Sequence, residues 1–387
     1  MGHKLAFLAL AAASVAAAAL TACGGKSESH VSKKLGTNLQ HVLDSAVATP
    51  KTGYPGAVLY VSRPKVGTWS GAAGEANVHP ATPMRPDDTF RAGSIMKPFI
   101  STVVLQLVEE GKFGLDDRLP TVLPRDVVAR IADADRITVR MLLNHTSGVP
   151  ECCGDEFDRA VLADPHRIWS VDELLDRAAA QPRPFAPGKG YAYSNTDYIL
   201  LGRVIDRATG ESWRTAIRER IIDRLGLKHT SLPEPGHLSI ASDAAHGYER
   251  VNGKLVDLTG VDPSVAGAAG GNGLVTTTRD LSRFLDAVLA GKLFEDASTL
   301  DAMLTFVHAT NDSGIPLGYG LGMERYTLPG GVVVIGHFGT GAGYRAFVGY
   351  APALKIDISI AFNGGKYAGG DPTTPILRAF QLMAAGS

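Results

Sequence analysis

The fold is decided by one short stretch, which reads Phe90-Arg91-Ala92-Gly93-Ser94-Ile95-Met96-Lys97-Pro98. Apolar residues continue at helical spacing from Phe99 to Val108, which predicts a helix with one buried face. In the first turn of such a helix, positions i and i+3 lie on the same side, so the Ser94 hydroxyl and the Lys97 amine are expected side by side. A serine hydroxyl becomes a good nucleophile when a neighbouring base takes its proton. Burial and the helix dipole both disfavour an ammonium here, so Lys97 is the candidate base.

The Ser-x-x-Lys pattern is weak evidence when it stands alone. A second copy occurs at Ser62-Arg63-Pro64-Lys65, where the proline and the strand-like runs on either side predict a hairpin loop instead of a helix. The alternative interpretation of Ser94 and Lys97 is a helix N-terminus with a solvated lysine. Other motifs must therefore decide between the two.

The composition is that of an ordinary globular protein. Of the 387 residues, 45% are hydrophobic and 20% are charged, and the net charge is -1. This length suits one large domain or two intermingled ones. A balanced charge gives no electrostatic reason to bind nucleic acid, so we expect no nucleic-acid partner.

The N-terminal segment has the features of an export signal. Lys4 precedes an alanine-rich apolar run over residues 5–20, which is short for a stable membrane span. The run ends in Leu20-Thr21-Ala22-Cys23, which resembles the bacterial lipobox, in which the cysteine is lipidated. We therefore expect a lipoprotein signal peptide over residues 1–22 and a polar tether over 23–32. The protein would then be extracytoplasmic and lipid-anchored to the bacterial cell membrane through Cys23. The alternative is an ordinary signal peptide with an incidental cysteine.

Cys152 and Cys153 are adjacent in the sequence. They can close a strained vicinal disulfide in an oxidising compartment, or they can remain two free thiols in a surface loop. No Cys-x-x-Cys or His-x-x-x-His pattern is nearby, so we expect no metal site here, and we expect no cofactor in the protein.

Hydrophobic periodicity predicts the elements of secondary structure. Helices are expected over 33–48, 139–144, 169–180, 196–209, 212–225, 277–290, 298–307 and 374–384, and strands over 57–61, 66–74, 317–326, 331–338, 343–350 and 356–362. Residues 150–168 are predicted to be a loop.

The order of these elements indicates an α/β (α+β) fold. One antiparallel β-sheet, built from residues 33–92 and 310–387, is expected to be flanked by N- and C-terminal helices. An all-helical region over residues 93–309 would be inserted between the two parts of the sheet, within a single domain spanning 33–387.

The second motif is Tyr193-Ser194-Asn195, between a proline-rich loop and a predicted helix. A phenol at the mouth of a cleft can shuttle a proton if a nearby cation lowers its pKa. The amide of Asn195 can orient a substrate carbonyl or the lysine. The alternative is an aromatic packing residue, followed by an asparagine that caps the helix.

The third motif is His337-Phe338-Gly339-Thr340-Gly341, at the end of an apolar strand. Its glycines allow the close backbone approach that an edge strand needs in order to pair with a substrate. The Thr340 N–H could join the Ser94 N–H as an oxyanion hole. The alternative is a glycine-rich turn with a surface histidine.

Together, the three motifs resemble the penicillin-recognising serine hydrolases in their order and their structural contexts. The branch they resemble is the class C β-lactamase and D-alanyl-D-alanine carboxypeptidase group. Further phrases agree with it, namely Met141–Gly148, Phe185–Gly188, Gly270–Leu274 and Tyr319–Gly322. The resemblance covers nearly all of the chain after the tether and implies a β-lactamase/transpeptidase-like fold.

The resemblance also implies catalytic roles. Ser94 would be acylated, and Lys97 would take its proton, either directly or through Tyr193. Tyr193 would return a proton to the leaving amine and later help to activate the deacylating water.

Binding roles follow from the same resemblance. Asn195 would hold the substrate amide, and His337 would replace the lysine of the family's Lys-Thr-Gly motif. The backbone N–H groups of Ser94 and of Thr340, which follows Gly339, would hold the oxyanion.

Phe338 departs from the family pattern. This position usually carries Thr, Ser or Gly, and a hydroxyl there helps to bind the terminal carboxylate of the substrate, which Phe338 cannot do. Arg325 or Arg345, on the neighbouring strands, could supply a carboxylate partner instead. The alternative for both is a solvated edge-strand arginine.

The implied function is a serine-type D-Ala-D-Ala carboxypeptidase that acts on cell-wall stem peptides. A β-lactamase or a carboxylesterase on the same fold is the close alternative, and a non-catalytic penicillin-binding sensor is a further one. The expected partners are a peptidoglycan-type peptide or a β-lactam or ester small molecule, and the membrane through Cys23.

Overall fold

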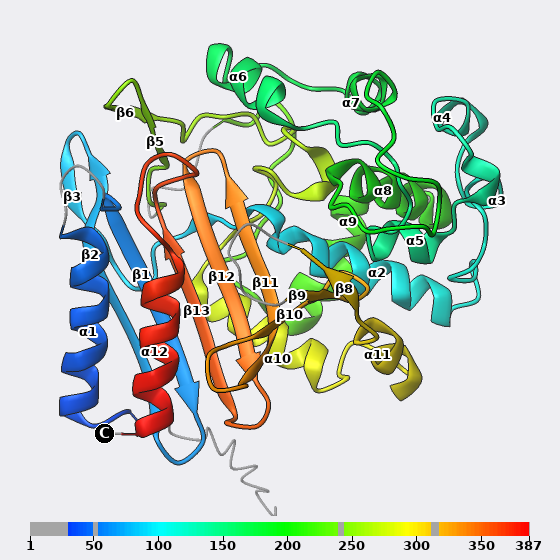
Figure 1. Cartoon of the computed structure of the whole chain (residues 1–387). Helices are drawn as coiled ribbons and strands as arrows, with labels where there is room; N and C mark the ends of the chain where they lie inside the picture. The colour runs from blue at the N-terminus through cyan, green and yellow to red at the C-terminus, as the bar shows by residue number, and fades with distance from the viewer. Residues whose placement is uncertain (1–29, 49–52, 239–243, 311–316, 387) are drawn as a thin grey trace, which may run out of the picture.

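An antiparallel sheet runs through the molecule (Figure 1). The computed structural model describes residues 30–48, 53–238, 244–310 and 317–386. In this part of the chain, nine strands form the sheet in the order β3-β2-β1-β13-β12-β11-β10-β9-β8. Their bounds are Gly56–Arg63 (β1), Gly67–Val78 (β2), Ala81–Pro83 (β3), Val307–Ala309 (β8), Leu317–Tyr319 (β9), Glu324–Thr327 (β10), Val333–Gly341 (β11), Tyr344–Ala351 (β12) and Ile356–Phe362 (β13).

The two ends of the domain meet in the middle of this sheet. β1 pairs with β13 in a register that sets Ala57 opposite Phe362. Every residue of β13 is buried, because helices cover both faces of the sheet at this point. The predicted joining of the first hairpin to the C-terminal strands is therefore confirmed.

Two helices from opposite ends of the chain cover one face of the sheet. α1 (Lys33–Val47) and α12 (Thr373–Ala385) lie side by side there (Figure 1). α1 buries Leu35, Leu39 and Leu43, which recur every four residues and so form one stripe. Each leucine that is fully buried contributes about 1.5–3 kcal/mol relative to an exposed one.

The helical region covers the other face, and α2 (Met96–Glu109) lies at its centre. Every residue of α2 from Met96 to Leu107 is buried. α2 packs against α8 (Asn195–Thr209), and its Phe99 stacks on Phe284 of α10 (Thr278–Leu289) with ring centroids 3.6 Å apart. A helix enclosed in this way holds its first turn rigidly. The other helices are Leu119–Val122 (α3), Arg125–Val128 (α4), Val139–Leu143 (α5), Asp155–Ala163 (α6), Val171–Ala179 (α7), Trp213–Ile217 (α9) and Ala297–Met303 (α11).

Several predicted element boundaries are wrong. The helix predicted over 298–307 ends at Met303, before β8 begins at Val307. Residues 150–168 are not one loop, because α6 forms within them and buries Phe157 and Val161, four residues apart. The predicted strand 317–326 is two strands, β9 and β10, because the chain turns between them.

The region over residues 93–309 is not all-helical. It contains a small hairpin, β5 (Tyr248–Val251) with β6 (Lys254–Asp257), and the strand β7 (Val275–Thr276). β7 pairs with β4 (Phe90–Arg91), directly before Ser94. This short pairing ties the start of the site to a segment far along the chain.

The second Ser-x-x-Lys copy, at residues 62–65, lies in the hairpin between β1 and β2, as predicted. The predicted signal peptide, Cys23 and the tether up to residue 29 lie outside the described residues. Within the described residues, no helix combines the length and the apolar character needed to cross a membrane.

Candidate active site

Ser94 lies in a single 3-10 turn, Gly93–Ile95, that leads directly into α2. Gly93 adopts a positive φ of 56°, and a Cβ atom at this position would come within 2.6 Å of the Thr340 backbone. Only glycine fits this close approach, which lets the turn lie against β11. Ser94 is partly exposed, and its Oγ atom lies 3.1 Å from Nζ of Lys97. The predicted juxtaposition of the two side chains is therefore present.

Three oxygens surround the Lys97 amine. They are Ser94 Oγ, Oδ1 of Asn195 at 2.8 Å and the carbonyl of Ala269 at 3.0 Å. Burial lowers the pKa of Lys97 to about 7, although the negative charges of Glu151 and Glu324 oppose this shift. A neutral amine that donates to Asn195 and Ala269 directs its lone pair at the Ser94 hydroxyl. This geometry suits proton transfer from Ser94 to Lys97.

Tyr193 lies on the other side of this amine. Lys97 Nζ is 4.7 Å from the centroid of the Tyr193 ring, and the tyrosine hydroxyl interacts with Ser94. Burial, with the negative charge of Glu324, raises the pKa of Tyr193 well above its usual value. The condition that a nearby cation lowers the pKa of Tyr193 is therefore not met, and the phenol keeps its proton at neutral pH.

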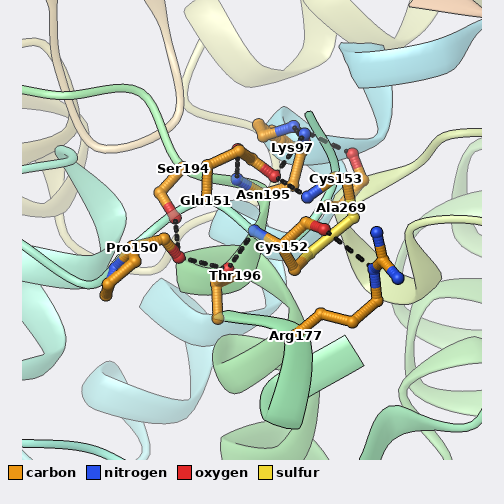
Figure 2. Close-up of a disulfide and its surroundings, with 10 residues drawn as sticks. All are labelled: Lys97, Pro150, Glu151, Cys152, Cys153, Arg177, Ser194, Asn195, Thr196 and Ala269. Carbon is orange, nitrogen blue, oxygen red and sulfur yellow. Dashed lines mark hydrogen bonds between the residues drawn. A yellow bond between two sulfur atoms is a disulfide. The ribbon is translucent and has the colours of Figure 1, made fainter. Parts of the chain in front are cut away.

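Asn195 is the first residue of α8 and does not cap it, since Ser194 occupies the N-cap position. The Asn195 side chain instead accepts from Lys97 through Oδ1 and donates to Glu151 through Nδ2 at 3.3 Å. The backbone N–H of Asn195 donates to the same carboxylate at 2.7 Å. Glu151 thus fixes the position of Asn195 through two hydrogen bonds, while Lys97 donates to the amide oxygen of the same side chain (Figure 2). No sequence motif predicted the role of Glu151, because this contact joins residues that are 44 positions apart.

His145 and Asp197 form a buried pair behind Tyr193. Nδ1 of His145 lies 3.0 Å from Oδ2 of Asp197, and the same nitrogen accepts the N–H of Ser194 at 3.3 Å. Burial disfavours charge on both groups, so a neutral pair with the proton on the carboxyl group is the favoured arrangement. In agreement, burial raises the pKa of Asp197 and lowers the pKa of His145. The His145 and Tyr193 ring centroids are 4.5 Å apart, so a neutral pair supports the tyrosine.

His337 is buried and reaches Tyr193 through a third aromatic residue. Its Nε2 atom lies 3.1 Å from the Tyr319 hydroxyl, and the Tyr319 and Tyr193 rings meet edge to face with centroids 6.1 Å apart. Burial lowers the pKa of His337, although Glu324, with Oε2 at 3.7 Å, raises it. The site therefore contains a neutral imidazole in place of a cation, and the alternative interpretation of His337 as a surface histidine is excluded.

β11 presents a free edge to Ser94. β10 pairs only with residues Val333 to Gly336 of β11, so none of the strands in the described part of the chain lies beside the following residues on that edge. The Phe338 N–H points outward along it and donates to Oε2 of Glu324 at 2.7 Å. N–H groups two residues apart in a strand point the same way, so the Thr340 N–H faces the same edge, beside Gly93. This direction is the one that an oxyanion hole requires.

A cavity of about 140 Å³ opens beside Ser94, Asn195 and Thr340. Its wall is mostly apolar and includes Cys153, Phe157, Val161, Leu162, Leu258, Val265, Ala266, Ala342 and Tyr367. Asp158 and Glu249 contribute carboxyl groups, and Lys366 is the one positively charged side chain among the described lining residues. Lys366 is already paired, with its Nζ atom 3.1 Å from Oδ1 of Asp155.

The structure does not bring the two candidate arginines to this cavity. Arg325 is exposed on β10 and stacks on Phe306, with its guanidinium 4.9 Å from the ring centroid. Arg345 donates to the Tyr54 hydroxyl and to the carbonyl of Lys366, on the sheet face that carries α1 and α12. Phe338 packs with an apolar cluster that also includes Tyr191 and Tyr193, and it is absent from the lining of the cavity.

Comparison with known proteins agrees with this fold and site. A protein-family model described as Beta-lactamase matches residues 36–382. The chain is 31% identical to the esterase EstB of Burkholderia gladioli, over 69% of this chain and 74% of that protein. It is 30% identical to penicillin-binding protein 4 of Amycolatopsis lactamdurans, over 72% and 73% of the two chains.

A solved structure is similar over almost the whole domain. The D-stereospecific amidohydrolase from Streptomyces sp. superimposes with a TM-score of 0.79 at 34% identity, covering 89% of this chain and 98% of that one. The chain therefore belongs to the β-lactamase family, and it is a serine hydrolase built on this fold.

Proposed function

We propose that the protein cleaves amide bonds of D-amino-acid derivatives through an acyl-enzyme formed at Ser94. The charge of the cavity is the observation that supports this substrate class. Asp158 and Glu249 line the cavity, and Lys366, its one cation among the described lining residues, lies 3.1 Å from Asp155 and 3.9 Å from Asp158, so carboxyl groups outnumber the cation around the cavity. A substrate with a free amine and no carboxylate suits these surroundings. The D configuration is supported by the similarity to the Streptomyces amidohydrolase.

The proposed acylation step uses the residues around Ser94. Ser94 Oγ attacks the amide carbon while its proton moves to neutral Lys97, 3.1 Å away. The N–H groups of Ser94 and Thr340 stabilise the negative charge that develops on the carbonyl oxygen. The carbon–nitrogen bond then breaks, and the leaving nitrogen takes a proton from the Tyr193 hydroxyl. Lys97 passes the proton that it took from Ser94 back to Tyr193. Water completes the cycle by the same steps in reverse, with Asn195 holding both Lys97 and the substrate amide.

A D-alanyl-D-alanine carboxypeptidase is the second candidate. The free edge of β11 beside Ser94 favours it, because an extended peptide can pair with such an edge. The similarity to penicillin-binding protein 4 points the same way. A carboxypeptidase must also hold a terminal carboxylate, and here Phe338 lacks a hydroxyl while Arg325 and Arg345 are engaged elsewhere.

One set of assays tests these proposals on the protein and its Ser94→Ala variant. The substrates are D- and L-phenylalanine amide, a D-Ala-D-Ala peptide and a p-nitrophenyl ester, with a labelled penicillin as acylating probe. We expect turnover of the D-amide and its loss in Ser94→Ala. Turnover of the peptide alone would favour the carboxypeptidase function. Turnover of the ester alone would favour the esterase function. Hydrolysis of the penicillin would indicate a β-lactamase, and acylation without any turnover would indicate a sensor.

The departure at position 338 can be tested separately. Phe338→Thr restores the hydroxyl of the family pattern. We expect kcat/KM for the D-Ala-D-Ala peptide, relative to kcat/KM for the D-amide, to rise roughly tenfold. This is the effect of one added hydrogen bond to a charged group. An unchanged ratio would show that this residue does not limit the recognition of the carboxylate.

We also propose that the protein works outside the cytoplasm, held to the cell membrane through lipidated Cys23. The lipobox-like sequence supports this location. In a bacterial host, Cys23→Ser is expected to move the protein from the membrane fraction to the soluble fraction. Retention in the membrane fraction would contradict the lipid anchor.

A further inference from the structure

The segment Pro150–Cys153 is bound to the start of α8 by a continuous set of hydrogen bonds (Figure 2). The carbonyl of Pro150 accepts from the hydroxyls of Ser194 and Thr196, at 3.3 and 2.7 Å. The Cys152 N–H donates to the Thr196 hydroxyl at 3.0 Å. These contacts flank Asn195 on both sides, so the position of Asn195 depends on the conformation of this segment.

Glu151 connects this segment to the reacting groups. Its carboxylate accepts the Cys153 N–H at 2.6 Å and both N–H donors of Asn195. Asn195 in turn accepts a hydrogen bond from Lys97. A path of three hydrogen-bonded residues therefore runs from the cysteine pair to the amine beside Ser94 (Figure 2).

Cys152 and Cys153 are joined by a disulfide, which decides between the two states that the sequence allows. The bond closes a small ring that contains one peptide bond, and it therefore removes most of the backbone freedom of both residues. The two sulfurs differ in surroundings. Cys152 is buried, with 3% of its surface exposed, whereas Cys153 is partly exposed and lines the cavity beside Ser94.

We propose that the Cys152–Cys153 disulfide is a positioning element and a redox switch of the active site. While the bond is closed, Glu151 holds Asn195 and Lys97 in their reactive arrangement. Its reduction by a dithiol frees the segment and lowers turnover. The kinetic part of this proposal rests on the proposed hydrolase function.

The switching step exchanges two electrons and two protons with the dithiol. A thiolate of the reductant attacks Cys153 Sγ from the cavity, forms a mixed disulfide and releases Cys152 as a thiolate, which then takes a proton. The second thiol of the reductant displaces Cys153 and closes the reductant's own disulfide. The protein gains two thiols, and an oxidised dithiol reverses both steps.

The test uses the full chain with Cys23→Ser. Of the chain's 3 cysteines, this variant keeps only Cys152 and Cys153. Dithiothreitol is the reductant, and thiol titration confirms that the bond is open. We expect kcat for the D-amide to fall roughly tenfold or more, as expected when a hydrogen bond to a charged group is weakened. The acid limb of kcat/KM should also move to lower pH, because Glu151 raises the pKa of Lys97 and moves away with the segment. Reoxidation should restore both values.

The double variant Cys152→Ser/Cys153→Ser, in the same background, is the matched control. It should show the low kcat without any reductant and should not respond to dithiothreitol. Full reduction with unchanged kcat and pH profile, or a double variant as active as the oxidised protein, would overturn the proposal.

A second measurement separates this proposal from the proposed function. Hydrogen exchange follows the backbone N–H groups of Cys152, Cys153 and Asn195, each of which is bonded within the segment or to it. Reduction is expected to speed their exchange while residues of α2 remain protected. Unchanged exchange after full reduction would refute the switch, even if none of the substrates is turned over.

Discussion

The Lys97 amine lies 3.1 Å from the hydroxyl oxygen of Ser94, at a position where the lysine side chain has no exposed surface. An ordinary lysine has a pKa of about 10.4 and is an ammonium at neutral pH, which cannot accept a proton. Burial lowers the pKa of Lys97 to about 7, so a large share of the residue is a free base under physiological conditions. In the proposed mechanism, the turn Gly93–Ile95 and the first turn of α2 after it supply the nucleophile and its base.

This relationship predicts the pH dependence of the reaction. The free base is the active form, so kcat/KM should be low well below pH 7, rise through about pH 7 and reach a plateau above it. The measurement is kcat/KM against pH, with an uncharged ester as substrate so that only the enzyme titrates. Lys97→Arg should lower kcat roughly 10²- to 10⁴-fold, because a guanidinium stays protonated. An acid limb near pH 10 would contradict this role.

The parts of the site that were predictable from the sequence are local. Ser94 and Lys97 are three residues apart at a helix start, so helix geometry alone places them together. Glu151 and Asp197 could not be found in this way, because their contacts depend on how loops and helices pack. The direction of the Tyr193 pKa shift was not predictable for the same reason, since burial is a property of the folded chain.

The fold also has features that the sequence predicts locally and features that depend on tertiary packing. The long amphipathic helices and the C-terminal strands follow from periodicity, and α7 begins with a capping box between Ser170 and Glu173, within the helix predicted over 169–180. The strands β3 and β8 have three residues each, which is too few to show a period, and they form by pairing with the neighbouring strands β2 and β9.

Glu324 is predicted to set the position of the acid limb. Its negative charge raises the pKa of both Lys97 and His337. Glu324→Gln keeps an oxygen that can accept the Phe338 N–H but removes the charge, so the acid limb of kcat/KM should move to lower pH, by up to about one unit. Arg325→Gln, which changes an exposed charge on the next residue, is the control and should leave the limb in place. A shift to higher pH in Glu324→Gln would contradict the assigned sign.

Asp197 is predicted to act as a neutral hydrogen-bond donor. Its carboxyl group meets Nδ1 of His145 and accepts from the Ser147 hydroxyl at 2.6 Å. Asn in its place can make the same two contacts. The free energy of unfolding of Asp197→Asn, measured by urea denaturation, should therefore be close to that of the wild type. Asp197→Ala leaves buried polar groups without partners and should cost about 1–3 kcal/mol. If the two variants lose equal stability, the pair carries a charge and the proposed protonation is wrong.

Catalysis is predicted to require the close approach of β11 to the Ser94 turn, which only a glycine at position 339 allows. A Cβ atom at this position would lie 2.0 Å from the Ala92 carbonyl oxygen, so Gly339→Ala must push the strand away from the turn. The Thr340 N–H then leaves the position where it can meet the oxyanion, and kcat should fall roughly 10²- to 10³-fold, as for the loss of one oxyanion donor. Gly114→Ala is the matched control, since its nearest neighbour is a side-chain atom of Asp117 at 3.4 Å, and it should keep wild-type kcat. Circular dichroism checks that both variants fold. A folded Gly339→Ala enzyme with unchanged kcat would show that the Thr340 N–H does not stabilise the transition state.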